Sequence, residues 1–182
     1  MKTATFFSIS LLACTLTSPA GAVEDKAKAP AKTPAEKLPP IYDEKADGQM
    51  AIGAALASAR KENRRVLIQW GGNWCPWCHR LFNQFKADKE LARTLAQDYD
   101  LVLVDIGRRE KNMALAAGYG ADLAKNGIPF LTILDADGKT LVNQPTEPFE
   151  KVSKEEKGYD SAKLLEFLKK YQAPRPGSQA EH

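Results

Sequence analysis

Two cysteines three residues apart carry the most specific chemistry in this 182-residue chain. Cys75 and Cys78 lie in the run Trp74-Cys75-Pro76-Trp77-Cys78-His79, between an apolar stretch that predicts a strand and apolar residues at helical spacing. We therefore expect Cys75 at a helix N-terminus, where unpaired backbone N–H groups and the helix dipole stabilise an anion. A thiolate is the attacking species in thiol chemistry, so this placement predicts a reactive Cys75.

Cys78 is expected one helical turn further along, within reach of a mixed disulfide formed at Cys75. Pro76 suits the first turn, because its missing N–H would have no partner there. The spacing therefore predicts thiol–disulfide exchange, with Cys75 as the nucleophile and Cys78 as the resolving thiol.

Three neighbours of the cysteines are further candidates. We expect Trp74 to pack beside the disulfide and Trp77 to offer an apolar contact to unfolded substrates, with ordinary core or rim packing as the alternative for both. For His79 we favour a solvated surface position over an electrostatic role beside the thiolate.

The elements that must position these residues alternate along the chain. A first helix is predicted after the cap Asp47, with apolar positions at Met50, Ala51, Ala54, Ala55 and Ala59. Strands are predicted over residues 65–70, 101–106, 130–134 and 140–143, and further helices from Cys75, after Asp88, over 113–117 and after Asp160. Strands separated by helices are expected to pair in parallel, and the last two, joined by Asp137-Gly138, to form a hairpin. This order predicts an α/β fold with a central mixed sheet flanked by helices.

Two stretches resemble the signatures of thioredoxin-like proteins. Residues 66–78, which end in Gly72-Asn73-Trp74-Cys75-Pro76-Trp77-Cys78, resemble the family's active-site strand and helix. Gly127-Ile128-Pro129, just before a predicted strand, resembles the cis-proline loop that faces the cysteines in the family. The resemblance covers roughly residues 47–171.

The resemblance implies a thioredoxin-like fold and a thiol–disulfide oxidoreductase that exchanges disulfides with exported proteins. It implies a cis Ile128–Pro129 bond and substrate docking along the backbone there, as an added strand. The expected substrate-binding residues are Trp74, Pro76, Trp77, Ile128 and Pro129. No organic cofactor or metal is expected, since the cysteine pair is itself the redox carrier.

The chain departs from thioredoxin six residues before Cys75. Thioredoxin carries a buried Asp there that is thought to help move the proton of the resolving thiol, whereas this chain has Gln69, which cannot act as a base. A water, a neighbouring group or the substrate must then handle that proton, or turnover is slower. The Pro76-Trp77 dipeptide also replaces thioredoxin's Gly-Pro.

Two other functions compete with this interpretation. Cys75 to His79 also spells C-x-x-C-H, the attachment motif for c-type haem, with His79 as proximal ligand and Met50 or Met113 as distal ligand. A strand leading into the motif and a Gly-Ile-Pro before another strand argue against a helical cytochrome. The second alternative is a non-catalytic thioredoxin-like module that binds partners.

The ends of the chain predict export. Residues 1–22 have the plan of a signal peptide, with Lys2, an apolar run over 4–16 and small residues before the cleavage site, which places the protein in the periplasm or outside the cell. Lipidation at Cys14 is a less favoured alternative. An Ala/Lys/Pro-rich linker (23–42), a thioredoxin-like domain (43–172) and a flexible tail (173–182) follow.

The charge balance bears on partners. A net charge of +3 is too small and too dispersed for a nucleic-acid-binding surface. We expect a monomer that acts on protein disulfides or dithiols and works with a redox partner protein, for which a membrane-embedded protein is one candidate. Disulfides persist in the expected compartment.

Overall fold

A four-stranded mixed sheet lies at the centre of the computed structural model, which describes residues 38–152 and 157–174. Its strands are β1 (Arg65–Gly71), β2 (Tyr99–Asp105), β3 (Phe130–Leu134) and β4 (Thr140–Pro145), in the order β2-β1-β3-β4. The predicted signal peptide, linker residues 23–37 and tail residues 175–182 lie outside the described residues.

The strand directions correct one expectation. β1 and β2 are parallel and β3 and β4 form the expected antiparallel pair, but β3 is antiparallel to β1 although helices separate them. Between β2 and β3 the chain has only α4 (Met113–Gly118) and α5 (Leu123–Asn126), of six and four residues. A six-residue helix spans about 9 Å and a seven-residue strand about 23 Å. Neither helix is long enough to carry the chain back along the sheet, and β3 starts at the end where β2 stops.

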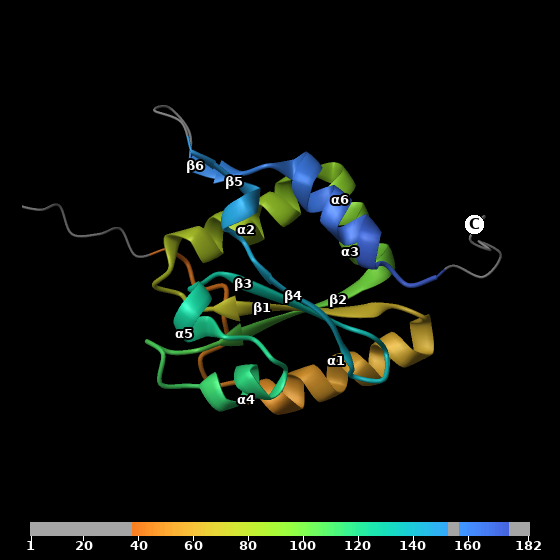
Figure 1. The fold of residues 1–182 in the computed structure, drawn as a ribbon, viewed down its shortest axis with the longest axis horizontal. Coiled ribbons are helices and arrows are strands. Elements are labelled where there is room, and N and C mark those ends of the chain that lie inside the picture. The colour runs from red at the N-terminus through yellow and green to blue at the C-terminus, as the bar shows by residue number, and fades with distance from the viewer. Residues whose placement is uncertain (1–37, 153–156, 175–182) are drawn as a thin grey trace, which may run out of the picture. The chain divides into compact units, whose positions relative to one another are not determined.

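Helices cover both faces of the sheet, as Figure 1 shows. On one face lies α1 (Gly48–Glu62), and on the other lie α2 (Pro76–Ala87), α3 (Lys89–Asp98) and α6 (Ser161–Tyr171). Three of these helices begin where an aspartate side chain accepts backbone N–H groups of the first turn: Asp47, Asp88 and Asp160. None of the helices in the described ranges has the length and apolar character needed to cross a membrane.

Three small elements besides α5 were not predicted from the sequence. A 3-10 turn (Glu147–Phe149) leads into β5 (Glu150–Val152), which pairs with β6 (Lys157–Tyr159) in a separate two-stranded sheet. Figure 1 places this small sheet on the α2 side of the central sheet. Strands of three residues are too short to show a period in the sequence.

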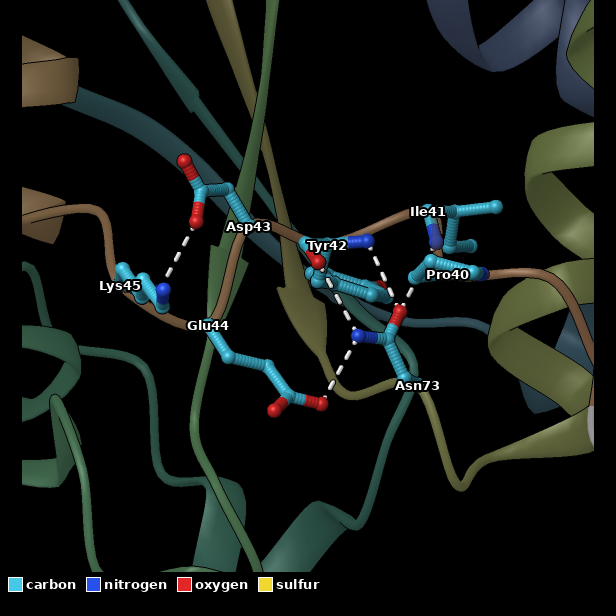
Figure 2. Close-up of a pocket in the computed structure, with 7 residues that line it drawn as sticks. All are labelled: Pro40, Ile41, Tyr42, Asp43, Glu44, Lys45 and Asn73. Atoms are coloured by element: carbon cyan, nitrogen blue, oxygen red, sulfur yellow. Dashed lines mark hydrogen bonds between the residues drawn. The ribbon is translucent and has the colours of Figure 1, made fainter.

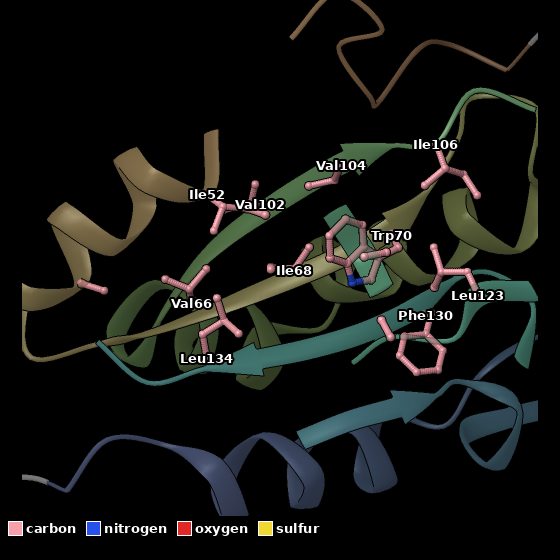
Figure 3. Close-up of a cluster of buried hydrophobic side chains, with 13 residues drawn as sticks. Ile52, Val66, Ile68, Trp70, Val102, Val104, Ile106, Leu123, Phe130 and Leu134 are labelled. Atoms are coloured by element: carbon pink, nitrogen blue, oxygen red, sulfur yellow. The ribbon is translucent and has the colours of Figure 1, made fainter. Parts of the chain in front are cut away.

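Alternating side chains of β1 divide the core in two. Val66, Ile68 and Trp70 point to the α1 face, where they pack with Ile52 (Figure 3). Leu67 belongs to the second core, under α2, α3 and α6. Burying one such large apolar side chain contributes about 1.5–3 kcal/mol.

The buried face of α1 differs from the predicted one. Met50 is 74% exposed and Ala54 is exposed, whereas Ile52 and Ala59 are completely buried. The branched side chain of Ile52 faces β1 and β2, and this turns Met50 to solvent. Two of the predicted apolar positions, Met50 and Ala54, therefore lie on the exposed side of the helix.

Candidate active site

Cys75 lies at the N-terminus of α2, as expected. It is the N-cap residue, with extended backbone angles, and its Sγ accepts a hydrogen bond of 3.1 Å from the backbone N–H of Cys78. The two cysteines form a disulfide, with their Cα atoms 5.3 Å apart. Pro76 occupies the first helical turn. The helix N-terminus thus directs backbone N–H groups at the sulfur that would carry negative charge after reduction.

The two sulfurs differ in burial. Cys75 is 5% exposed and Cys78 is completely buried. Gly71, at the end of β1, makes room for Cys78, because a Cβ on Gly71 would lie 2.6 Å from the Cys78 Sγ and would also collide with the Tyr42 hydroxyl. A glycine is therefore needed where β1 passes beneath the disulfide.

Polar side chains lie beneath the buried cysteine. Gln69 is completely buried, and its Nε2 donates to the Tyr42 Oη at 2.7 Å and to the Cys78 carbonyl at 3.1 Å. The Gln69 Oε1 is buried and accepts no hydrogen bond among the described residues. A buried acceptor without a donor is unfavourable by about 1–3 kcal/mol.

Tyr42 forms a buried cluster with the cysteines, although it is the last residue of the predicted linker. It is 3% exposed. Burial raises the pKa of its hydroxyl well above the ordinary value, and the nearby Asp105 carboxylate adds to this shift. Tyr42 therefore remains a neutral hydroxyl beside the disulfide at any physiological pH.

Asn73 holds the segment that contains Tyr42 through hydrogen bonds, as Figure 2 shows. Its Oδ1 accepts from the backbone N–H groups of Ile41 (2.8 Å) and Tyr42 (2.9 Å), and its Nδ2 donates to the Tyr42 carbonyl (3.0 Å) and to Glu44 (2.9 Å). Asn73 and residues 40–45 line a surface pocket of about 540 Å³. The residue two places before Cys75 thus holds the irregular segment that precedes α1.

His79 is not at the surface, so the prediction of a solvated histidine was wrong. It is 4% exposed, and its Nε2 lies 2.9 Å from the Asn73 carbonyl oxygen. A carbonyl oxygen only accepts, so the Nε2 carries the hydrogen. The imidazole links the first turn of α2 to the loop before it, which a helical position alone could not reveal.

The two tryptophans have different surroundings. Trp74 is 40% exposed, its indole N–H donates to the Gly107 carbonyl, and the Arg108 guanidinium lies 5.6 Å from its ring centroid. Trp77 is half-buried and packs against both the cysteine cluster and the Tyr159 ring, with centroids 5.5 Å apart. Trp74 therefore offers the larger exposed aromatic surface beside Cys75.

The Ile128–Pro129 peptide bond is cis, and the loop lies against the cysteines. Ile128 is half-buried and packs on the cysteine cluster, while Pro129 is buried and its carbonyl accepts from the Thr146 hydroxyl at 2.8 Å. Gly127 has φ +74°, a left-handed conformation that favours glycine. Among the described residues, no hydrogen bond reaches the backbone N–H or C=O of Ile128.

Asp105 is a buried charged residue that acts on Tyr42 of this cluster and that the sequence did not suggest. It ends β2 directly opposite Gly71 and is 6% exposed. Burial raises the pKa of its carboxyl, an effect opposed by a hydrogen bond from the Gly107 N–H (3.0 Å) and by Lys111 at 3.8 Å. Among residues 38–152 and 157–174, no three His, Cys, Asp or Glu side chains are arranged to hold a metal ion.

Known proteins share the fold of this chain. Residues 49–136 match the thioredoxin-like family model. A crystal structure of a disulphide isomerase from Xylella fastidiosa Temecula1 superposes with a TM-score of 0.61 at 26% sequence identity, covering 73% of this chain and 97% of that one. The fold is therefore thioredoxin-like, as the two motifs implied.

Two curated proteins are similar over shorter stretches. The disulfide bond reductase DsbH of Chlamydia pneumoniae is 27% identical over 103 residues, which are 52% of this chain and 60% of that protein. Spermatogenesis-associated protein 20 of Homo sapiens is 35% identical over 51 residues, 28% of this chain and 6% of that protein. The chain thus spans less than two thirds of either relative.

Proposed function

This chain carries a thioredoxin-like domain, and we propose that it is a thiol–disulfide oxidoreductase that exchanges disulfides with exported proteins. The observation that carries the proposal is the disulfide between Cys75, at the N-cap of α2, and Cys78, one turn along. Similarity to proteins named as a disulfide bond reductase and a disulphide isomerase supports the same chemistry.

Cys75 is the nucleophile in this proposal. Its sulfur is the more exposed of the two and receives the Cys78 N–H, so its thiolate is stabilised where a substrate can reach it. The thiolate attacks one sulfur of a substrate disulfide, which forms a mixed disulfide and releases the other substrate sulfur as a thiolate.

Cys78 resolves this intermediate. Its thiolate attacks the Cys75 sulfur, which forms the Cys75–Cys78 bond and releases the second substrate sulfur. The substrate gains two electrons and takes up two protons, and the enzyme is oxidised. The reverse sequence oxidises a substrate dithiol.

Substrate docking is assigned to the residues around Cys75. The unpaired backbone of Ile128, next to the cysteines, can accept an extended substrate chain as an added strand. Pro76 and Trp74 are exposed beside the disulfide and offer apolar contacts, whereas Trp77 is half-buried against the cysteine cluster and Pro129 is buried. This arrangement suits an unfolded segment on either side of a substrate cysteine.

Export completes the proposal. We propose residues 1–22 as a signal peptide and 175–182 as part of a tail, with the monomeric protein acting in the periplasm. The linker then ends before Ile41, because the buried Tyr42 belongs to the catalytic domain. Each exchange transfers two electrons and leaves the cysteine pair in the opposite redox state. A redox partner protein must therefore restore the starting state before the next exchange.

Haem attachment is disfavoured by the geometry of the same residues. The thioether bonds to haem would need both cysteine sulfurs, which are bonded to each other. The proximal iron ligand would need a histidine nitrogen, whereas the His79 Nε2 is hydrogen-bonded to the Asn73 carbonyl. Of the two proposed distal ligands, Met50 points to solvent from α1 and Met113 packs against the core on the α1 face. A purified protein without a Soret band is expected.

Trapping of substrates tests the cysteine roles. In a Cys14→Ser background, which removes the third cysteine, Cys78→Ser should accumulate mixed disulfides with exported proteins, because no thiol remains to resolve them. Cys75→Ser should accumulate none above background, since it lacks the nucleophile. Non-reducing gels followed by mass spectrometry identify the complexes.

Insulin reduction with glutathione as electron source measures the activity itself. The Cys14→Ser protein should be active, and either active-site substitution should abolish turnover. Equal trapping by both variants would refute the assigned roles, and an inactive Cys14→Ser protein would favour the non-catalytic module instead.

A further inference from the structure

The proposed reaction requires the completely buried Cys78 to be a thiol in one step and a thiolate in the next. A buried thiolate is unfavourable unless a neighbouring group solvates it. Gln69, beneath the cysteine, has no ionisable group, so this neighbour must be sought elsewhere in the described structure.

Gly71 shows that the Tyr42 hydroxyl and the Cys78 sulfur lie close to the same backbone position. A Cβ on Gly71 would run into both the Tyr42 hydroxyl and the Cys78 Sγ. Both atoms therefore lie over the same face of the same residue, and Tyr42 belongs to one buried cluster with the two cysteines.

The hydrogen bonds of Gln69 determine how the Tyr42 hydroxyl is used. The Cys78 carbonyl can only accept, so the Gln69 amide must turn its Nε2 toward it. The same nitrogen donates to the Tyr42 oxygen at 2.7 Å. The tyrosine oxygen thus already accepts, and its own hydrogen is available for another acceptor.

The surroundings of Tyr42 keep that hydrogen in place. Burial raises the pKa of Tyr42 well above its ordinary value, the Gln69 hydrogen bond opposes this rise, and the Asp105 carboxylate and Tyr159 add to it. Lys111, Glu44 and Glu110 act on Asp105 in turn, and His79, from α2, is engaged by the Asn73 carbonyl. Tyr42 is therefore a permanent neutral donor beside the sulfur.

We propose that the Tyr42 hydroxyl, oriented by Gln69, donates a hydrogen bond to the Cys78 sulfur once the disulfide opens and so stabilises the resolving thiolate. The inference rests on the proposed function and adds a residue outside the stretch that matches the family model. Tyr42 transfers no proton. Cys78 loses its proton to solvent, its thiolate displaces the substrate sulfur from Cys75, and the released substrate thiolate takes up a proton.

Reaction of the reduced Cys14→Ser protein with Ellman's reagent separates the two chemical steps. Attack by Cys75 releases a first thionitrobenzoate anion, and resolution by Cys78 releases a second. Tyr42→Phe should leave the first release unchanged and slow the second about tenfold at neutral pH. A tenfold slowing corresponds to the loss of one hydrogen bond to the charged sulfur, which is equivalent to a rise of about one unit in the pKa of Cys78.

A matched control removes a buried tyrosine hydroxyl elsewhere. Tyr99 is also 3% exposed, and its hydroxyl donates to the Leu168 carbonyl in the second core. Tyr99→Phe should change neither release. The pKa of Cys78, followed by carbon-13 NMR of labelled cysteine, should rise in Tyr42→Phe alone.

A second substitution covers the case in which Tyr42→Phe folds poorly. Fluorotyrosine at position 42 is a stronger donor of nearly the same shape and should speed the second release. An unchanged second release in Tyr42→Phe, or equal slowing of both releases, would overturn the inference while leaving the proposed function intact. Absence of any release from the Cys14→Ser protein would instead overturn the proposed function.

Discussion

Gly71 is the residue on which the packing around the buried sulfur depends. We expect Gly71→Ala to lower the free energy of unfolding by about 1–3 kcal/mol, the usual effect of an extra methyl group in a full site. The cause is the collision of the new Cβ with the Cys78 Sγ and the Tyr42 hydroxyl. Denaturant unfolding of the oxidised protein measures this difference.

Gly53→Ala is the matched control. Gly53 lies within α1, and a Cβ there would meet no atom within 4 Å. This substitution should stabilise the protein by about 0.5–1 kcal/mol, because alanine is the better helix former. A Gly71→Ala protein as stable as the wild type would show that Tyr42 or Cys78 moves aside without loss.

The local pattern predicted the cysteine pair, its helix and the Ile128–Pro129 loop, because each is encoded by adjacent residues. The same pattern could not show Tyr42 or Asp105, which are separated from the cysteines along the chain and lie beside them only through tertiary packing. The burial of His79 was missed for a related reason, since its partner is a backbone carbonyl in the preceding loop.

Asp88 illustrates how a helix start responds to pH. Hydrogen bonds, first of all from the Leu91 backbone N–H, hold the pKa of Asp88 below its ordinary value. A folded-state pKa below the unfolded one gives stability that is fully present above the unfolded pKa and is lost as the pH falls through the folded pKa.

We therefore expect Asp88→Ala to lower the free energy of unfolding by about 1 kcal/mol at neutral pH, and by less in acid. Asp88→Asn keeps an accepting oxygen and should be close to wild type at neutral pH, with a shallower loss of stability on acidification. Urea unfolding over a range of acidic pH values measures both slopes. Equal acid slopes in the wild type and Asp88→Asn would contradict this account.

Elements with a strong local period were predicted well, and elements defined by tertiary structure were not. The helices that begin after Asp47, Asp88 and Asp160 start where the caps indicated. The predicted direction of β3 was wrong because direction depends on the end at which the chain re-enters the sheet, and α5, with four residues, is too short to have a recognisable apolar face. Helix capping is a local property, whereas strand direction is not.

The segment before α1 extends the active site beyond the family-matched region. Asn73→Ala removes the four hydrogen bonds that hold Ile41, Tyr42 and Glu44. At about 1 kcal/mol each, partly offset by water, their loss should reduce the hydrogen-exchange protection of the Ile41 and Tyr42 amides by about a hundredfold. The amides of the β1–β3 pairing should keep most of their protection.

Asn83→Ala provides the comparison, because Asn83 is exposed on α2. It should leave the protection of Ile41 and Tyr42 at the wild-type level. Unchanged protection in Asn73→Ala would mean that packing of Tyr42 alone holds the segment.

The residues around the buried Cys78 sulfur come from parts of the chain that meet only in the folded protein. Tyr42 comes from the segment before α1, Gln69 and Gly71 from β1, and Asp105 from β2, while Cys78 lies in α2. An unfolded or newly exported chain has the same four-residue motif but none of these neighbours. Its two cysteines then form an ordinary dithiol, so the reactivity of the pair develops only as the tertiary structure forms. A folding defect far from α2 would therefore be observed as a loss of redox activity.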